Sequence, residues 1–237
     1  MLYIVSLFSS LILLCSVTHA SPESFDPLDA YKQLEVPEKG PLKLNVRFLK
    51  TQENATAEMT YNDKNQIERV DFSKDGRDEG FSTFHYGPHG ILEEKIFDTN
   101  QEIMETVFYL YSSNGTLEGY KVLNKDGKEI IRWEYRYHKG KLYSGIRTIQ
   151  ETVTEKFYMR QLSENQILQS IFDDTGEKAA EITLSYEEGK ILSREFNSAM
   201  KRKVEYKYNE SGKLAEVLTS EEINGMMQVT SVQKFQY

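Results

Sequence analysis

The sequence predicts an all-β fold, an antiparallel β-meander of about seven 25-residue hairpin repeats coiled into a spiral or barrel-like sheet. Three observations lead to this prediction. A Gly or Asn recurs at a nearly constant spacing, and apolar and polar residues alternate with a period of two between these positions. No stretch after residue 40 has the 3.6-residue apolar period of an ordinary helix. At 237 residues, the chain suits one folded domain, which we place at residues 41–237.

The first 20 residues differ from the rest, because they form an apolar run without any Lys, Arg, Asp or Glu. Thr18 and Ala20 are small enough for a signal-peptidase site, and Pro22 keeps the chain beyond the cut extended. We therefore expect residues 1–20 to be a signal peptide and the mature chain to begin near Ser21. Lipid attachment at Cys15 is the less favoured alternative. The protein would then be secreted, periplasmic or held at the cell surface, with no transmembrane segment after signal cleavage.

The next segment, residues 21–40, contains three of the five prolines and no clear period. We expect it to be an extended lead-in or linker, with a short helical turn as an option within 28–34. Cys15 is the only cysteine, so the mature chain would have no disulfide and no cysteine-based metal site. Its stability would have to come from packing and hydrogen bonds.

The turn positions define the repeat. Successive turns are 25, 25, 25, 25, 24 and 23 residues apart, at Asn65, Gly90, Gly115, Gly140, Asn165, Gly189 and Gly212. Gly and Asn adopt positive φ at low cost, as tight hairpin turns require. Midway between them lies a second set, Asp75-Gly76, Asn100, Asp126-Gly127, Thr175-Gly176 and Asn224-Gly225, so each repeat should hold two strands. The second signal is missing near Thr152 and Met200, where we expect longer or differently built turns.

The segments between the turns read as strands, about 15 in all. Residues 42–49 and 57–61 precede the repeats proper. In residues 131–137, odd positions are apolar or aromatic and even positions are Arg or Glu, and 182–186 and 204–208 alternate in the same way. One apolar face predicts a half-buried antiparallel sheet. The second strands of the repeats, such as 67–72, 92–97 and 167–172, carry more charge.

The segments Tyr206–Leu214 and Tyr109–Leu117 share the pattern Tyr-x-Tyr-x-x-x-Gly-x-Leu. The first resembles the core of the YD-repeat, or rearrangement-hot-spot, family, which reads Tyr-x-Tyr-Asp-x-x-Gly-Arg-Leu. Asn209 and Lys213 replace the family's Asp and Arg. The resemblance spans roughly residues 57–237 and implies a secreted or cell-surface antiparallel β-spiral, some members enclosing another polypeptide. The period of 25 is longer than the family's usual one, and seven repeats are too few for a large shell. Repeats of the membrane-occupation-and-recognition type are similar in Tyr-x-x-x-Gly-x-Leu. Neither resemblance implies a catalytic residue.

An aromatic ladder is the only candidate site. It consists of Tyr61, Tyr86, Tyr111, Trp133, Tyr137, Tyr186 and Tyr208. These rings would either form a binding face on which sugars stack or fill the inside of the coiled sheet, with their hydroxyls bonded to water or backbone. We favour the core interpretation, because Leu162 stands at the ladder position of the fifth repeat and cannot serve as a stacking platform.

The sequence gives little support for nucleic-acid binding, metal binding or catalysis. The net charge of −8 argues against a nucleic-acid partner. His85, His89 and His138 are too dispersed for a metal site, and acidic turns are common without Ca²⁺. No hydrolase elbow, metalloprotease or phosphate-loop motif is present. We therefore expect no catalytic residue, metal or cofactor. An outer-membrane barrel is disfavoured, because runs 93–95 and 187–188 place charge on both faces.

The leading hypothesis is an exported, non-enzymatic β-repeat scaffold that binds a protein or glycan at the cell envelope or outside the cell. The alternative is a carboxylate-dependent hydrolase or lyase that acts on envelope polysaccharide from the concave face. A third option is a partner that lends strand 42–49 or 229–237 to another chain. Carboxylates clustered beside exposed tyrosines in a pocket would favour the enzyme, and a pocket walled by Tyr, Leu and Phe alone would favour the scaffold.

Overall fold

The computed structural model describes residues 27–237, so the predicted signal peptide lies outside the described residues. A short 3-10 helix, η1 (Asp29–Tyr31), precedes sixteen strands in this part of the chain. The first eight are β1 (Lys43–Phe48), β2 (Asn54–Tyr61), β3 (Ile67–Lys74), β4 (Arg77–Gly87), β5 (Gly90–Phe97), β6 (Ile103–Tyr111), β7 (Leu117–Asn124) and β8 (Glu129–His138). The others are β9 (Lys141–Ile149), β10 (Thr152–Ser163), β11 (Gln166–Asp173), β12 (Lys178–Glu187), β13 (Lys190–Asn197), β14 (Arg202–Tyr208), β15 (Leu214–Ile223) and β16 (Met226–Gln236).

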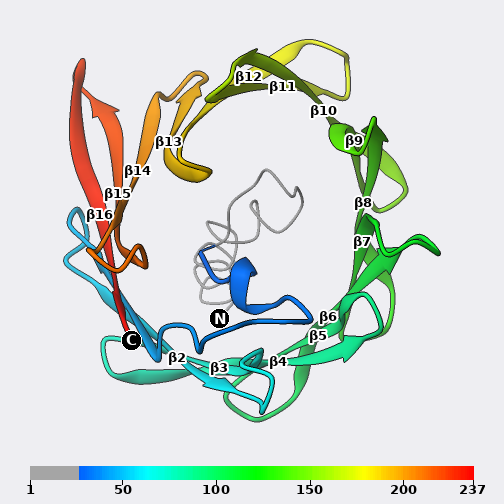
Figure 1. Cartoon of the computed structure of the whole chain (residues 1–237), viewed down its shortest axis with the longest axis vertical. Coiled ribbons are helices and arrows are strands. Elements are labelled where there is room, and N and C mark those ends of the chain that lie inside the picture. The colour runs from blue at the N-terminus through cyan, green and yellow to red at the C-terminus, as the bar shows by residue number, and fades with distance from the viewer. Residues whose placement is uncertain (1–26) are drawn as a thin grey trace.

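The strands form one closed antiparallel barrel (Figure 1). Each strand pairs with its neighbours in sequence, and β1 pairs with β16 to close the ring, Lys43 opposite Gln236 and Phe48 opposite Ser231. The predicted all-β antiparallel class is confirmed, and the sheet is a closed barrel rather than an open spiral. A twisted sheet of this many strands curls, and pairing its two ends satisfies the backbone groups that open edges would expose. No helix within residues 27–237 has the length and apolarity to cross a membrane.

The turns lie at two rims. We call the end with turns β2–β3, β4–β5 and so on to β14–β15 the tyrosine rim, and the other end the far rim. Six turns share one device, in which the side-chain oxygen of the first residue accepts a hydrogen bond from the backbone N–H four residues later. These first residues are Asn62, Asp98, Ser112, Asn124, Asp173 and Asn209.

Two turns of the far rim lack the Gly or Asn signal, as the sequence suggested, and they differ from each other. Gln150 and Glu151 connect β9 to β10 as a two-residue turn with φ of 46° and 70°, although neither is Gly or Asn. Residues 198–201 connect β13 to β14 as a longer loop. The first turn is therefore differently built and the second is longer.

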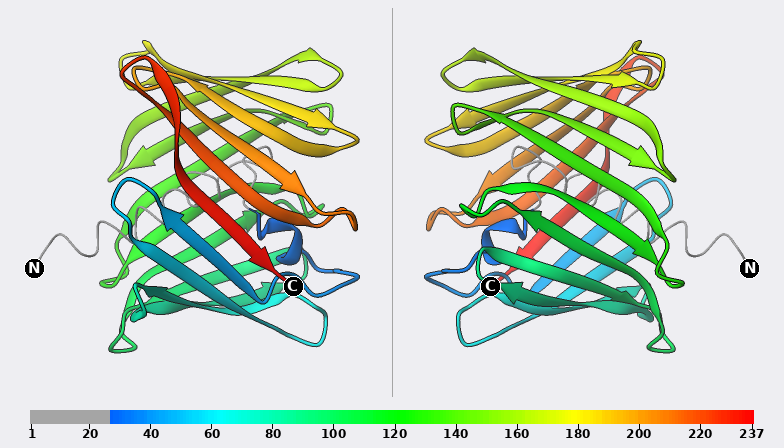
Figure 2. Two further views of the ribbon diagram at one scale, coloured as in Figure 1. Left: turned by 90° about the vertical axis from the view of Figure 1, so that its left-hand side faces the viewer. Right: turned by 90° about the vertical axis from the view of Figure 1, so that its right-hand side faces the viewer.

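The segment 27–42 lies inside the barrel at its tyrosine rim (Figures 1 and 2). The Gln66 side chain donates hydrogen bonds to the backbone oxygens of Gln33 and Leu34, at 2.7 and 3.1 Å. Tyr31 meets Tyr61 edge to face, with ring centroids 6.3 Å apart. These contacts identify the face of β2 that carries Tyr61 as the inward face.

Candidate functional site

The strand register shows which residues of every strand face the barrel axis. Met59 pairs with Val70, and Val70 with Ser82, so that alternate residues of each strand point to the barrel axis. The buried apolar residues are of this inward set, and they form one continuous cluster. A sixteen-stranded barrel of ordinary tilt measures about 30 Å between opposite backbones, whereas two facing sheets fill a gap of only about 10 Å with side chains. The inward side chains alone cannot span this width, and Leu28 and Tyr31 of the segment 27–42 pack against them inside the barrel. We call this interior of the barrel the lumen.

The tyrosines of the ladder form a ring at the tyrosine rim, and each of them sits at a β-bulge. The pairing shifts by one residue at Tyr61, Tyr86, Tyr111, Tyr137, Tyr186 and Tyr208. A bulge re-aims the side chain that follows it. Here the repeated shift points each ring inward over the strand before it.

Four of these hydroxyls donate hydrogen bonds to backbone oxygens, and the hydroxyl of Tyr237, which follows β16, does the same. Tyr61 bonds Pro41 at 2.6 Å, Tyr86 bonds Ile67 at 2.9 Å, Tyr137 bonds Leu117 at 2.7 Å, Tyr208 bonds Ile191 at 2.9 Å, and Tyr237 bonds Leu214 at 3.0 Å. Burial raises the pKa of Tyr137 and of Tyr208 to about 12. The rings are half-buried, and these bonds tie neighbouring hairpins together.

The sequence argument from Leu162 is wrong. The pairing of β10 with β11 shifts between Gln161 and Ser163, and Leu162 is 45% exposed. Gln161 is the residue that pairs with Ile167, at the place where other repeats have Tyr. The fifth repeat thus lacks a ladder ring, and Leu162 does not replace one.

Trp133 lies deeper in the barrel than the tyrosine ring. Its ring is 5.7 Å from that of Phe157, and Tyr135 packs 6.4 Å from Phe157. All three side chains are buried, with 7%, 6% and 1% exposure for Trp133, Tyr135 and Phe157. A Cβ at Gly145 would come within 2.3 Å of Phe157, so this glycine makes room for the aromatic cluster.

Two glutamates face the lumen from the wall formed by β5 and β6. Glu94 pairs with Val107 and Glu105 with Ile96, which puts both carboxylates on the inward face. Glu94 is 6% exposed, and the Tyr109 hydroxyl donates to its Oε2 at 3.3 Å. Burial raises the pKa of Glu105, and the nearby charge of Glu94 raises it further. We call Glu94 and Glu105 the acidic pair.

Two arginines face the lumen from the wall formed by β13 and β14. Arg194 pairs with Val204, and Phe196 pairs with Arg202, all on the inward face. The guanidinium carbons of Arg194 and Arg202 lie 5.2 and 4.0 Å from the centre of the Phe196 ring. Arg194 is 3% exposed. Burial lowers the pKa of Arg202, and the charge of Arg194 lowers it further. We call Arg194 and Arg202 the basic pair.

The acidic and basic pairs occupy equivalent positions of the repeat. Glu94 lies opposite Phe84, two residues before Tyr86, and Arg194 lies opposite Leu184, two residues before Tyr186. Glu105 and Arg202 each precede a ladder tyrosine by six residues. From β5 and β6 to β13 and β14 is eight strands in either direction, so the pairs face each other across the ring (Figure 1).

A third charged group lies between them on β9 and β10. Arg147 and Glu155 are cross-strand partners, with Nη2 and Oε2 3.0 Å apart. Burial raises the pKa of Glu155, and the charge of Arg147 opposes this rise. The barrel wall therefore carries the acidic pair, a neutral ion pair a quarter of the way round, and the basic pair. Lys32 of the inner segment is 8% exposed, and its ammonium lies 5.5 Å from the ring of Phe84, the residue opposite Glu94.

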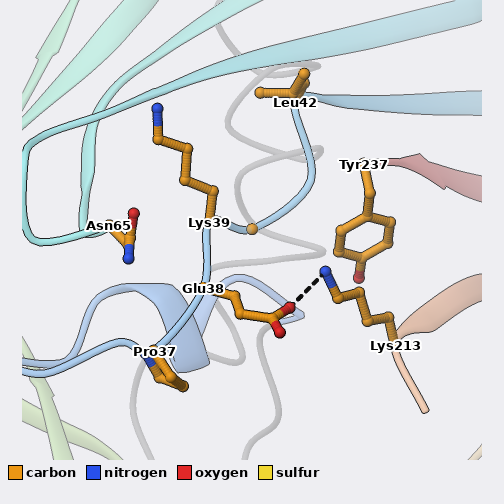
Figure 3. A pocket seen from close by; sticks show the side chains of 8 residues that line it. Pro37, Glu38, Lys39, Leu42, Asn65, Lys213 and Tyr237 are labelled. Atoms are coloured by element: carbon orange, nitrogen blue, oxygen red, sulfur yellow. Dashed lines mark ion pairs between the residues drawn. The ribbon is translucent and has the colours of Figure 1, made fainter. Parts of the chain in front are cut away.

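A cavity of ≈ 510 Å³ opens at the tyrosine rim, between the segment 27–42 and the barrel wall (Figure 3). Its lining is Pro37, Glu38, Lys39, Gly40, Leu42, Asn65, Lys213 and Tyr237. Glu38 and Lys213 form an ion pair of 2.8 Å across it, and the Lys213 ammonium lies 5.0 Å from the Tyr237 ring. Because Glu38 and Lys213 neutralise each other, we assign this cavity to the contact that holds the segment 27–42 against the barrel wall, and not to a second binding site.

The histidines singled out in the sequence do not converge. His89 lies 6.1 Å from the Tyr111 ring, and His138 lies 6.5 Å from Tyr143. Within residues 27–237, no three His, Cys, Asp or Glu side chains are placed to hold a metal ion.

Sequence reasoning missed the acidic and basic pairs. In an alignment of the repeats, the position of Glu94 and Arg194 is filled by Val70, Tyr120, Gly145, Gln169 and Val217 elsewhere. A charge in a mostly apolar column is the signal that would have found them. This signal can be seen only after the strand register has aligned the repeats, because the β-bulges insert one residue at different places.

The comparisons with known proteins bear on the fold alone. No protein-family model matches the sequence, and no curated protein is similar to it. Among solved structures, the barrel is similar to a porin-like protein from Bacteroides uniformis ATCC 8492, with a TM-score of 0.57, 12% identity, and coverage of 83% of this chain and 96% of that chain. A porin-like protein from Bacteroides vulgatus ATCC 8482 matches with a TM-score of 0.37 and 8% identity, over 84% of this chain and 99% of that chain. The likeness to the first supports the closed barrel fold.

Proposed function

We propose that this chain is an exported, non-enzymatic binding protein that takes the apolar part of an amphipathic small molecule into its barrel. The distribution of side chains carries the proposal. The inward face is mostly aliphatic and aromatic, and the barrel is too wide for these side chains to fill. Apolar surface around such a space favours an apolar ligand, because burying it removes both surfaces from water.

The outer wall supports a barrel that faces water. It carries ion pairs between strand residues, such as Lys43–Glu58 at 2.7 Å, Arg69–Asp71 at 2.6 Å and Lys207–Glu216 at 2.9 Å. A barrel wall that contacts lipid instead carries an apolar band about 25 Å tall. Paired charges along β1 to β3 and β14 to β15 suit water better than hydrocarbon.

The ligand class differs from the protein or glycan that the sequence suggested. The glycan form of that idea could use the tyrosine ladder as an exposed stacking platform. Tyr86, Tyr137 and Tyr208 point inward and donate to backbone oxygens. Their hydroxyls are engaged in the structure of the rim, which favours a ligand held inside the barrel over one stacked outside it.

The sole tryptophan provides the test, because Trp133 lines the lumen. A hexadecanol with bromine on its terminal carbon should quench Trp133 emission in a saturable titration, since bromine quenches indole on contact. The matched control is a Trp133→Phe/Tyr158→Trp variant, which moves the only indole to the outer wall, where Tyr158 is 43% exposed. Quenching of both indoles alike, or of neither, would contradict the proposal.

A second candidate function keeps the hydrolase or lyase alternative. The acidic pair places two carboxylates beside Tyr109, and a raised carboxyl pKa suits a general acid. The expected sign is release of reducing ends from envelope polysaccharide that a Glu105→Gln substitution abolishes while the fold remains intact. Unchanged release in that variant, or no release by the wild type, would exclude this candidate.

A further inference from the structure

The basic pair is the feature of the lumen that a purely apolar ligand leaves unexplained. Arg194 and Arg202 come from adjacent strands and pack on one ring, Phe196. Among the ion pairs of residues 27–237, neither arginine takes part in one. The Nε atoms of both are buried and have no hydrogen-bond partner.

Such an arrangement is costly for the protein alone. A buried charge without an ion-pair partner loses its hydration, and the cation–π contacts with Phe196 offset only part of that loss. Two guanidinium groups beside the same ring also repel each other, and the low dielectric of an apolar wall strengthens that repulsion. The cost falls when an anion sits between the two groups, because each guanidinium can donate to carboxylate or phosphate oxygens in a planar fork.

The surrounding charges do not provide this anion. Glu221 lies opposite Arg202 in the pairing of β14 with β15, and its charge acts on Arg202. It forms no ion pair with either arginine within the part of the chain that the structure describes. The acidic pair stands on the opposite wall, eight strands away, and forms no ion pair with the arginines in the described part of the chain.

We propose that Arg194 and Arg202 hold the anionic head group, a carboxylate or a phosphate, of the amphipathic ligand whose chain lies in the lumen. The inference rests on the proposed function and names its substrate class. Leu184, Val204 and Phe196 surround the basic pair on the inward face and continue as apolar wall. A head group at the arginines and a chain along this wall satisfy the charge and the apolar surface together.

The experiment compares ligands that differ only in the head group or the chain. Palmitate and hexadecanol share a chain of the same length, and acetate has the head group alone. Titrations by calorimetry should show palmitate binding at least about tenfold more tightly than hexadecanol, with acetate much weaker than both. In the Arg194→Gln/Arg202→Gln variant, palmitate should lose this advantage, while hexadecanol binding changes by less than about twofold.

A matched control variant separates the site from general electrostatics. Arg160→Gln removes an exposed arginine whose partner Leu168 faces outward, and it should change nothing. If the Arg160→Gln variant lost the preference for palmitate to the same extent, the preference would depend on net charge alone, and the proposal would be overturned.

The outcomes distinguish a failure of the proposed function from a failure of the anion site. If wild-type protein binds neither palmitate nor hexadecanol, the lumen-binding function itself is wrong. If it binds both with equal affinity, the function stands and the anion site is wrong. Acetate binding as tight as that of palmitate would overturn the amphiphile as the ligand. These wild-type comparisons decide the matter even if the double variant does not fold.

Discussion

Two inward-facing tyrosines show how differently the same residue is used. The Tyr86 hydroxyl donates to the Ile67 oxygen at 2.9 Å, whereas the Tyr135 hydroxyl is buried without a hydrogen-bond partner. Removing the hydroxyl of Tyr86 by substitution with Phe should therefore cost about 1 kcal/mol of unfolding free energy. Tyr135→Phe should be neutral or slightly stabilising, because it removes an unsatisfied polar atom. Urea unfolding measures both, and equal losses would contradict the distinction.

The Tyr135 ring, unlike its hydroxyl, should matter greatly for stability. The residue is 6% exposed and packs against Trp133 and Phe157. Tyr135→Ala should cost about 3 kcal/mol or more, as deletion of a buried aromatic does. Tyr143 is 51% exposed, so Tyr143→Ala is a control that should cost less than about 0.5 kcal/mol. A small loss at Tyr135 would show that the ring is exposed in solution.

Glu105 should make stability depend on pH in an unusual direction. Burial and Glu94 raise its pKa in the folded protein, so folded protein keeps the Glu105 proton to higher pH than unfolded protein does. Its contribution is fully present below the ordinary carboxyl pKa and is lost as pH rises through the raised value. Glu105→Gln should thus be more stable than wild type at pH 7, and the advantage should shrink toward pH 4. An advantage independent of pH would refute this.

At the scale of elements, the hairpins could be predicted because their determinants are local. The Gly or Asn positions and the period-two alternation each act within a few residues, so the strands begin and end close to the expected places. The β-bulges escaped prediction, because a one-residue shift is defined by the partner strand. Leu162 shows the consequence: counting residues placed it in the ladder, and the bulge of β10 turns it outward.

The Gln150-Glu151 turn has backbone dihedral angles that are unfavourable for residues other than Gly or Asn. Both residues have positive φ, 46° and 70°, which costs a residue with a Cβ about 1 kcal/mol or more. Gln150→Asn/Glu151→Gly should raise the unfolding free energy by about 1 kcal/mol. The reverse test is Gly225→Ala, where φ is 79° and a Cβ meets nothing within 4 Å. That substitution should cost about as much, and no change in either variant would refute the turn argument.

At the scale of the whole molecule, the sequence could not choose between a spiral and a closed barrel. Closure depends on β1 and β16, which are nearly the whole described chain apart and carry no mark of their mutual pairing. The lumen escaped prediction for the same reason. Glu94 and Arg194 look like ordinary strand charges among 37 acidic and 29 basic residues, and only the ring brings them to opposite walls of one space.

Closure can be tested by a covalent link across the seam between β1 and β16. Asn45 and Lys234 are direct partners on the outer face, and partners in antiparallel strands lie about 5 Å apart, within reach of a disulfide. In a Cys15→Ser background, Asn45→Cys/Lys234→Cys should therefore form an intramolecular disulfide under mild oxidation. Because the link closes a very long loop, it should raise the unfolding free energy by about 5 kcal/mol.

The matched control for the seam is Asn45→Cys/Glu216→Cys. Glu216 pairs with Lys234 from β15, one strand farther from Asn45, so the two cysteines would be about 10 Å apart and should stay reduced. Non-reducing gels and mass spectrometry distinguish a bond within one chain from a bond between two. If only the intermolecular bond forms, β1 and β16 of one chain do not meet, and the ring is completed by a second copy. A closed monomer, by contrast, has no free strand edge to lend, which argues against the idea that residues 42–49 or 229–237 pair with another chain.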